Sequence, residues 1–257
     1  MARLCQSLEA ENSANTRDMI IYCKEVNQTS HTMNDTLVTF VRHGKNNFGL
    51  DGTPWHAGPH LSLEGWEQAN KTGRYLRSFV FDAVLSSDMN RAADTAKAIC
   101  KYQKKIGVKK IIFCRELAEH NEIVYGHPTK KKLDKDGEWA KARRTVKFFK
   151  EILKKYKGQR VLIAAHGNVI RACFGAALGF PIHYSPEINS FNCSLTTIAM
   201  RGQKLKAIFN INYTDHLGEF SFQRRLEQVK FISDYSKLIN GDNGCGPVKA
   251  SAKVKKR

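Results

Sequence analysis

The chain has 257 residues, which suits one sizeable domain with appendages, and its 42% hydrophobic content is enough for a folded core. No apolar run reaches the roughly 18 residues that a membrane-spanning helix needs, and the N-terminus lacks the apolar stretch of a secretory signal. The seven cysteines are scattered and form no C-x-x-C pair. These features predict a cytoplasmic protein with reduced thiols and disfavour membrane-spanning and disulfide-bonded secreted classes.

The formal net charge of +18 is the unusual property of the composition. It attracts anions in general, and the charge alone does not distinguish phosphates, nucleic acid and acidic lipid. A solubilising basic surface explains it equally well. No basic stripe interleaved with aromatic residues is present, so nucleic acid is not the expected partner.

The two ends of the chain differ in composition from its middle. Residues 1–35 are polar with little periodicity and are interpreted as a flexible N-terminal extension. Residues 240–257 combine turn-forming residues with the basic end KVKKR and are interpreted as a tail. The folded domain is therefore expected to occupy residues 36–239.

Within that domain, apolar β-branched runs typical of strands alternate with segments of helical periodicity. Strands are predicted at 36–41, 81–86, 110–114, 161–165, 193–200 and 205–211. Helices are predicted at 62–80 (with Ser62 as N-cap), 90–102, 138–156 and 168–178. The run 161–165 is apolar throughout, which indicates a central strand. This order predicts an α/β fold: a three-layer α/β/α sandwich with a mainly parallel central sheet.

In such folds, ligands bind beyond the carboxyl ends of the strands. The first strand is followed by Arg42, His43 and Gly44, and the glycine allows the chain to turn so that both polar side chains face one pocket. The central strand is followed by His166 and Gly167, where a new helix begins. Free backbone N–H groups and the positive end of the helix dipole at that point suit a phosphate.

Two further strand ends add charged residues to the same edge. Arg91 follows the second strand at the start of a helix. Glu116, Glu119 and Glu122 follow the third strand, and any of them could lie at the edge. Histidines, arginines and a carboxylate therefore converge there.

Phosphoryl transfer explains why these residue types belong together. Guanidinium groups stabilise the spread negative charge of the transferred group and orient it. A neutral imidazole can attack phosphorus to form a phosphohistidine, which water later hydrolyses. A carboxylic acid with a raised pKa can protonate the leaving alkoxide.

Five motifs occur in the order typical of one family. They are R-H-G at 42–44, L-S-x-x-G-x-x-Q-A at 61–69, S-S-x-x-x-R-A-x-x-T-A at 86–96, L-x-E at 117–119 and H-G-x-V-I-R at 166–171. On these motifs the chain resembles the histidine phosphatase superfamily, which includes the cofactor-dependent phosphoglycerate mutases. The resemblance covers about residues 36–218 and implies a phosphoglycerate mutase-like fold.

The resemblance implies His43 as the nucleophile, Arg42, Arg91 and His166 as the phosphate pocket, and Glu119 as the proton donor. One departure is visible after R-H-G, where the family commonly has Glu or Gln and then Ser or Thr. Here Lys45 makes the pocket rim more cationic, and Asn46 can still donate a hydrogen bond to phosphate.

No metal and no cofactor are expected. His56 and His60 flank a segment that contains glycine and proline and is not helical, so their spacing does not indicate a metal site. The chain also lacks the G-x-x-x-x-G-K-[ST] motif of nucleotide-driven enzymes.

The predicted activity is that of a metal-independent, histidine acid phosphatase-like phosphomonoester hydrolase. Family mutases usually carry a long helical insertion before the second histidine motif, and residues 92–165 leave no room for it. The alternatives are a phosphoglycerate mutase-type phosphotransferase and a catalytically inactive phosphate-binding scaffold. The substrate class stays open between a phosphorylated small molecule and a phosphoprotein, and a homodimer is also left open.

Overall fold

A computed structural model describes residues 34–47, 57–103, 110–120, 137–181 and 188–221. The chain divides into two compact units, Met1–Gly218 and Glu219–Arg257, and only 219–221 of the second unit are described. The predicted extension at 1–35 and the tail at 240–257 lie almost entirely outside the described residues. The predicted limits of the domain at 36 and 239 therefore stay predictions.

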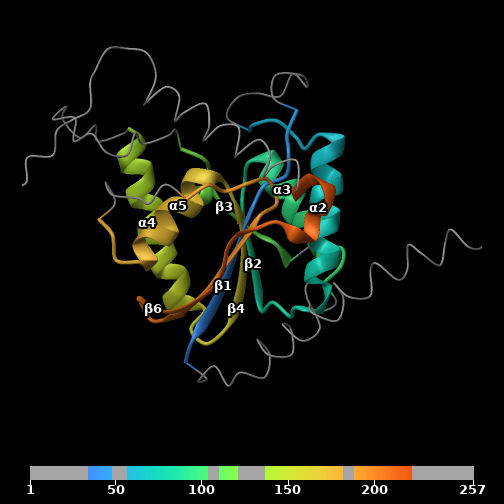
Figure 1. Cartoon of the computed structure of the whole chain (residues 1–257). Helices are drawn as coiled ribbons and strands as arrows, with labels where there is room; N and C mark the ends of the chain where they lie inside the picture. The colour runs from blue at the N-terminus through green and yellow to red at the C-terminus, as the bar shows by residue number, and fades with distance from the viewer. Residues whose placement is uncertain (1–33, 48–56, 104–109, 121–136, 182–187, 222–257) are drawn as a thin grey trace, which may run out of the picture. The chain divides into compact units, whose positions relative to one another are not determined.

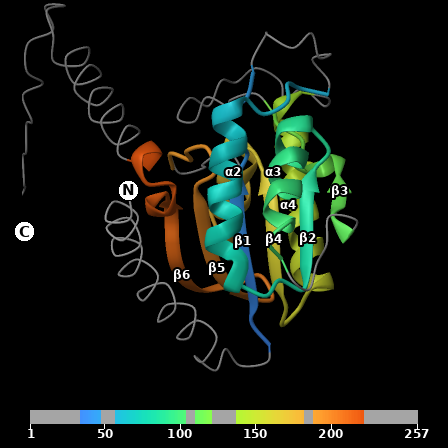
Figure 2. The same ribbon diagram turned by 90° about the vertical axis from the view of Figure 1, so that its right-hand side faces the viewer.

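A six-stranded sheet with the order β3-β2-β4-β1-β5-β6 forms the centre of the first unit (Figure 2). Its strands are β1 Thr36–Arg42, β2 Ala83–Ser87, β3 Ile112–Cys114, β4 Arg160–Ala165, β5 Leu195–Arg201 and β6 Lys204–Tyr213. β4 pairs in parallel with β1 and β2, and β2 pairs in parallel with β3, whereas β5 is antiparallel to β1 and β6. The predicted central position of 161–165 and the mainly parallel sheet are confirmed.

Helices cover both faces of this sheet (Figure 1). They are α2 Leu63–Tyr75, α3 Asn90–Cys100, α4 Glu138–Lys155 and α5 Gly167–Ala177. Three short 3-10 helices are also described: η1 Leu76–Ser78 after α2, η3 Arg115–Leu117 after β3 and η4 Asp215–Leu217 after β6. α2 and α3 lie on one face, and α4 and α5 lie on the other. The predicted α/β/α sandwich is therefore confirmed. Among the described helices, none combines the length and the apolar character that crossing a bilayer requires.

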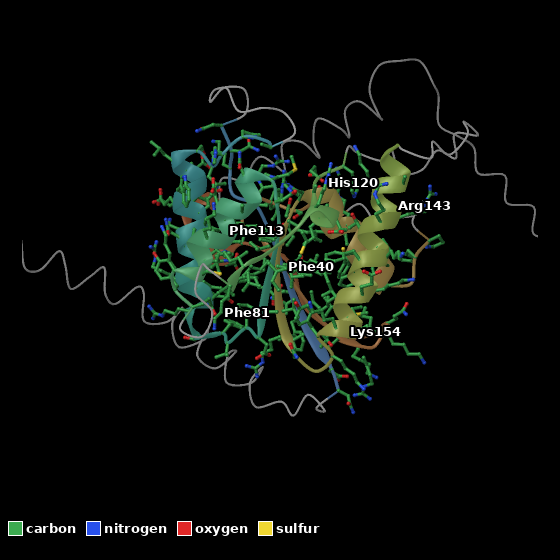
Figure 3. The ribbon with its side chains drawn as sticks, turned by 180° about the vertical axis from the view of Figure 1, so that it is seen from behind. Phe40, Phe81, Phe113, His120, Arg143 and Lys154 are labelled. Atoms are coloured by element: carbon green, nitrogen blue, oxygen red, sulfur yellow. The ribbon has the colours of Figure 1, made fainter. Side chains whose placement is uncertain are left out.

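The alternation of side chains along the strands builds one apolar core on each face. In β4, Ile163 packs with residues of α4 and α5, and its neighbour Leu162 packs with residues of α3. Phe40 of β1 lies in the first core, with its ring centroid 5.7 Å from that of Phe149 on α4. Phe81 lies in the second core, and Figure 3 shows these two phenylalanines on different sides of the sheet.

Two of the predicted elements differ clearly in length from the sequence pattern. The helix predicted to reach Val80 ends at Tyr75 and tightens into η1, and Val80 is exposed. The strand predicted from Lys110 begins at Ile112, and both Ile112 and Phe113 are exposed. β3 is an edge strand with a neighbour on one side only, so an apolar run there is not buried as it would be in the centre.

Candidate active site

The carboxyl ends of the parallel strands bring two histidines and an arginine together. His43 follows β1 and His166 follows β4, and their ring centroids are 5.1 Å apart. The backbone N–H of His43 donates to the carbonyl of Ala165 at 3.0 Å, which fixes the two strand ends against each other. Arg91, at the start of α3, donates from Nε to His43 Nε2 at 3.1 Å. The predicted convergence of these three residues on one edge is thus found in the structure.

The His43 ring has its two nitrogens in different environments. Nδ1 lies 2.8 Å from the carbonyl oxygen of Gly44, which can only accept, so Nδ1 carries the proton. Nε2 then holds a lone pair, which accepts the hydrogen bond from Arg91. Burial holds the pKa of His43 well below its ordinary value, and the positive charges of Arg42 and Arg91 act in the same direction. His43 is therefore a neutral imidazole with a lone pair on Nε2.

The chain after His43 is held by the start of α2. Ser62 donates from its backbone N–H to the carbonyl of Lys45 at 2.9 Å, and Gln68 accepts from the N–H of Lys45 at 3.0 Å. A Cβ at Gly65 would lie 1.9 Å from the Lys45 carbonyl oxygen, so no other residue fits there without movement. The Ser, Gly and Gln of the second sequence motif thus all lie against the backbone of Lys45, two residues after the nucleophile. The predicted Ser62 N-cap is confirmed, because its side chain accepts from the Gly65 N–H.

His166 is fully buried at the N-terminus of α5. Its Nε2 lies 2.9 Å from the Ser87 hydroxyl, and that hydroxyl also accepts from the backbone N–H of Met89 at 3.2 Å. Its Nδ1 has no hydrogen-bond partner among the described residues. Burial lowers the pKa of His166 well below its ordinary value, with His43 and Arg91 adding to the effect. The ring is neutral and has one nitrogen left for a ligand.

Two arginines lie close enough to this histidine pair for their charges to lower the pKa of both rings. Arg42 donates to the Ser190 carbonyl, and its guanidinium carbon lies 4.0 Å from the position of a Cβ at Gly167. Arg91 is buried, which lowers its pKa, and the opposing cause is the charge of Glu119. A Cβ at Gly58, whose φ is +71°, would lie 2.4 Å from Arg91 Nη1, so the chain passes close to this guanidinium. Both arginines and Gly167 therefore lie at the predicted edge.

Glu119 is the acidic residue of the site. Burial raises its pKa to about 7, although Arg91 and Arg42 and the backbone N–H groups of His120 and Asn168 act in the opposite direction. The His120 N–H donates to Oε1 at 3.3 Å. A carboxyl group with this pKa is partly protonated at neutral pH and can act as an acid.

The other candidate carboxylates have different positions. Glu116 is exposed, and its carbonyl accepts from the Thr145 hydroxyl at 2.8 Å on the side of α4. Glu122 lies outside the described residues. Of Glu116 and Glu119, it is Glu119 whose carboxyl group interacts electrostatically with Arg91 and Arg42.

The predictions for the two residues after R-H-G, Lys45 and Asn46, can be compared with their contacts in the structure. Asn46 forms an isolated antiparallel bridge with Leu61, which places its backbone beside the site, and its predicted contact with phosphate stays a prediction. Lys45 forms an ion pair with Glu64, so the extra positive charge expected at the rim is compensated.

Sequence reasoning missed three residues that support the site. Asn192 donates from its side chain to the His43 carbonyl at 2.9 Å, and Ser190 supplies the carbonyl that binds Arg42. Nothing in the local sequence marks either of them, because they reach β1 from a distant loop. Ser87 stands in the S-S-x-x-x-R motif, but its hydrogen bond to His166 was not predicted. β2 and β4 are neighbours in the sheet although β3 lies between them in the sequence. Arg171, the last residue of the H-G-x-V-I-R motif, donates to the Ile188 carbonyl at 2.8 Å.

Within the described part of the chain, no group of three or more His, Cys, Asp or Glu side chains has the arrangement of a metal site. His60 Nδ1 lies 2.7 Å from the buried Asp94 carboxylate on α3, whereas His56 lies outside the described residues.

Comparisons with known proteins agree with this arrangement. The sequence profile described as histidine phosphatase superfamily (branch 1) matches residues 38–145 and 140–212. The serine/threonine-protein phosphatase Pgam5, mitochondrial, of Drosophila ananassae is 32% identical over 171 residues, which cover 63% of this chain and 58% of that protein. The 2,3-bisphosphoglycerate-dependent phosphoglycerate mutase of Bradyrhizobium sp. (strain BTAi1 / ATCC BAA-1182) is 31% identical over 172 residues, which cover 54% of this chain and 80% of that protein.

Solved structures share the fold at low sequence identity. The phosphoserine phosphatase of Entamoeba histolytica has a TM-score of 0.54 at 20% identity and covers 71% of this chain and 99% of its own. The phosphoglycerate mutase of Bacillus anthracis str. Sterne has a TM-score of 0.54 at 20% identity and covers 72% of this chain and 96% of its own. The chain spans 58% of the length of the Drosophila relatives.

Proposed function

The chain belongs to the histidine phosphatase superfamily, and on this basis we propose that it is a phosphomonoester hydrolase that works through a phosphohistidine on His43. One observation carries the proposal. His43 is neutral, its Nδ1 proton is bound by the Gly44 carbonyl, its Nε2 lone pair faces Arg91, and the His166 ring centroid lies 5.1 Å from its own. A nitrogen prepared in this way is a nucleophile for an anionic phosphate held by arginines.

In the first step, the Nε2 lone pair of His43 attacks phosphorus and the P–O bond to the leaving group breaks. Arg42 and Arg91 bind phosphoryl oxygens and stabilise the charge that spreads over them. Glu119 in its protonated form gives its proton to the leaving oxygen, so an alcohol departs.

His166 acts as a hydrogen-bond donor in the same step. In this proposal the Ser87 hydroxyl accepts from the Met89 N–H and donates its own proton to His166 Nε2. The ring proton then stands on Nδ1, the nitrogen without a partner among the described residues, which donates to a phosphoryl oxygen.

In the second step, water attacks the phosphohistidine. The Glu119 carboxylate accepts a proton from the water, the N–P bond breaks, and its electron pair returns to His43 Nε2. Inorganic phosphate leaves, and both Glu119 and His43 regain their starting states. No step requires a metal ion, and metal independence is part of the proposal.

The substrate class that we propose is a phosphoprotein. The Drosophila relatives support it, since their names describe serine/threonine-protein phosphatases. A phosphorylated small molecule is the alternative. Those names also place the Drosophila proteins in mitochondria, and a cytoplasmic location for this chain stays a prediction.

A mutase is the second candidate function, because the Bradyrhizobium mutase is matched over 80% of its length. Hydrolase and mutase share the phosphohistidine and differ in the acceptor, which is water in one and a substrate hydroxyl in the other. An assay for phosphoryl transfer between phosphoglycerates separates them.

The test is hydrolysis of p-nitrophenyl phosphate in the presence of EDTA, comparing the wild type with His43→Ala. We expect activity to survive EDTA and to fall by at least about 1,000-fold in the variant. Glu67→Ala, an exposed position on α2, serves as the control, and circular dichroism verifies the folding of each protein. A phosphoenzyme trapped in the wild type and retained by His43→Ala would refute the assignment of the nucleophile. No turnover by the wild type of any phosphometabolite or phosphopeptide would favour the inactive scaffold.

A further inference from the structure

A second concave site lies away from the catalytic residues. It is a cavity of about 720 Å³ between the C-terminal half of α4, the hairpin that joins β5 to β6, and the residue stretch before β1. Its charged lining residues are Lys147, Lys150, Glu151, Lys154, Lys157 and Arg201. We call it the α4 pocket. Its volume falls within the range of ligand-binding sites in proteins.

The α4 pocket and the catalytic histidines lie at opposite ends of the sheet. Asn34, which lines the pocket, precedes β1, and His43 follows the other end of that strand. β1 has seven residues, so the two sites are about 20 Å apart. Figure 3 shows His120, which neighbours Glu119, toward one end of α4 and Lys154 toward the other. The α4 pocket is therefore not an extension of the catalytic site.

The lysines of the α4 pocket form a single stripe. Lys147, Lys150 and Lys154 follow one another on α4 at intervals of three or four residues, which is the repeat of one helix face, and Lys157 follows just beyond the end of the helix. Within the described residues none of the four has an ion-pair partner. Like charges at this spacing repel one another, and Glu151 is the carboxylate of the lining that opposes them. An anionic ligand would remove this repulsion.

Arg201 differs from the lysines because Asp35 already binds it. Two of its nitrogens donate to the two Asp35 carboxylate oxygens at 2.7 and 3.1 Å. This pair joins the end of β5 to the residue before β1, and of its two members Arg201 lines the pocket. The charge left for a ligand is that of the lysines.

We propose that the α4 pocket binds an acidic segment of a partner polypeptide. Along the helix axis, the part of the stripe from Lys147 to Lys154 is about 10 Å long, which an extended peptide covers with about three residues, and Lys157 extends the stripe beyond the helix. The site is concave, whereas a bilayer surface is flat and a nucleic-acid duplex is broad, so a single extended chain fits it better. Lysines act as mobile point charges and suit carboxylates at varied positions.

The test measures the binding of a fluorescein-labelled hexaglutamate peptide to the full chain by anisotropy at low salt. The variant Lys150→Gln/Lys154→Gln removes two positive charges from the pocket and keeps good helix formers. We expect it to bind roughly 5- to 30-fold more weakly than the wild type. Raising the salt from 50 to 300 mM should weaken wild-type binding in the same direction.

The matched control is Arg77→Gln/Lys101→Gln, which removes two exposed positive charges in η1 and at the end of α3, on the other face of the sheet. It should keep wild-type affinity for hexaglutamate. Equal losses in both double variants, or equal binding of a hexaglutamine peptide, would refute the α4 pocket as the site. Pocket-dependent binding to vesicles containing phosphatidylserine, without binding to the peptide, would assign it to a membrane surface instead.

Measuring the hydrolysis of p-nitrophenyl phosphate tests whether the α4 pocket is independent of the catalytic site. Both double variants should hydrolyse it at the wild-type rate, because the α4 pocket lies at the other end of the sheet. A loss of hydrolysis in the pocket variant would contradict the independence of the two sites.

Discussion

The two ionisable groups with the central chemical roles are shifted in opposite directions by the same cause. Burial favours the neutral form of any side chain, so it lowers the pKa of His43 and raises that of Glu119 to about 7. A nucleophile must be unprotonated and an acid must be protonated, and both states therefore coexist near neutral pH. The arginines add to the shift of His43 and oppose that of Glu119, which is why the latter remains moderate.

Glu119→Gln should separate substrates by their leaving groups. An alkyl phosphate needs a proton on its leaving oxygen, and we expect its kcat/KM to fall by about 100- to 10,000-fold. The nitrophenolate leaving group needs little assistance, so kcat/KM for p-nitrophenyl phosphate should fall far less. Equal losses on both substrates would show that another group donates the proton.

The pH dependence gives an independent measurement of the same carboxyl group. Its acid form is the active one in the first step, so kcat/KM for an alkyl phosphate should decline as pH rises through about 7. In Glu119→Gln this decline should disappear. Because the pKa of His43 is lowered, its ring stays neutral at pH values well below the ordinary pKa of histidine. Protonation of His43 should therefore inhibit the enzyme only in more acidic solution than for an ordinary histidine.

Ser87→Ala should affect catalysis through the tautomer of His166. Without the hydroxyl, His166 Nε2 loses its hydrogen bond and the proton is no longer confined to Nδ1. We expect kcat to fall by about 10- to 100-fold. The ring-nitrogen NMR signals of His166 should show mixed tautomers.

Ser86→Ala is the matched control for that change. Ser86 is also fully buried in β2, and its hydroxyl donates to the Ser87 carbonyl and not to an imidazole. It should keep the activity and the His166 tautomer of the wild type. If both serine variants lost activity equally, packing of β2 and not the tautomer would be responsible.

At the scale of elements, the start of α2 holds the turn after the nucleophile. Gly65→Ala would place a Cβ 1.9 Å from the Lys45 carbonyl oxygen, so the helix and the turn must separate. We expect a loss of about 1–3 kcal/mol in the free energy of unfolding. A displacement of His43 of about 1 Å should also lower kcat by about 100-fold.

Thermal unfolding and steady-state kinetics measure these two effects. Glu67→Ala lies on the exposed face of the same helix and should change stability by no more than about 0.5 kcal/mol. A stable and fully active Gly65→Ala protein would mean that the close contact is not required.

The order of elements was predictable because each strand is a short apolar run and each helix has a clear repeat. Residues 161–165 were expected in the centre since they are apolar throughout, and β4 lies there. Boundaries were less predictable: Phe81 was expected inside a strand, but it precedes β2 and fills the core beside α3. An apolar residue predicts that its side chain is buried. It does not predict whether the backbone at that position forms the hydrogen bonds of a strand.

The site was predictable where its residues stand at strand ends, and not where the tertiary fold supplies them. His43 and His166 have sequence signals because each follows an apolar run and precedes a glycine. Asn192 contacts His43 from a position 149 residues later, and Glu64 meets Lys45 across a helix start. Such contacts depend on the spatial order of the elements, which periodicity does not contain.

At the scale of the whole molecule, the two ends of the sheet present different kinds of positive charge. At the catalytic edge the arginines are buried or half-buried and tied by hydrogen bonds, so they can orient one phosphoryl group. At the other end the lysines of the α4 pocket are exposed and without ion-pair partners in the described residues. Fixed guanidinium groups suit chemistry, and mobile ammonium groups suit adaptable binding.

The stability of the first unit should depend on its buried neutral histidines. His43 and His166 have strongly lowered pKa values, and burial lowers that of His216 to about 3. Below pH 6.5 the unfolded chain binds protons that the folded chain does not, so stability should decrease as pH falls. Glu119 acts in the opposite direction between about pH 4.5 and 7, because its folded form holds the proton more tightly, and it offsets one histidine.

His216→Gln tests this linkage without touching the catalytic residues. His216 is stacked on Tyr75 and Tyr213, and its Nε2 lies 3.0 Å from the Thr72 hydroxyl, a contact that glutamine can keep. Between pH 6 and 5, the free energy of unfolding should fall by about 1.4 kcal/mol less in the variant than in the wild type. Urea titrations at the two pH values measure this difference. An unchanged slope would mean that His216 takes up its proton in the folded protein, and the acid sensitivity would then rest on the catalytic pair alone.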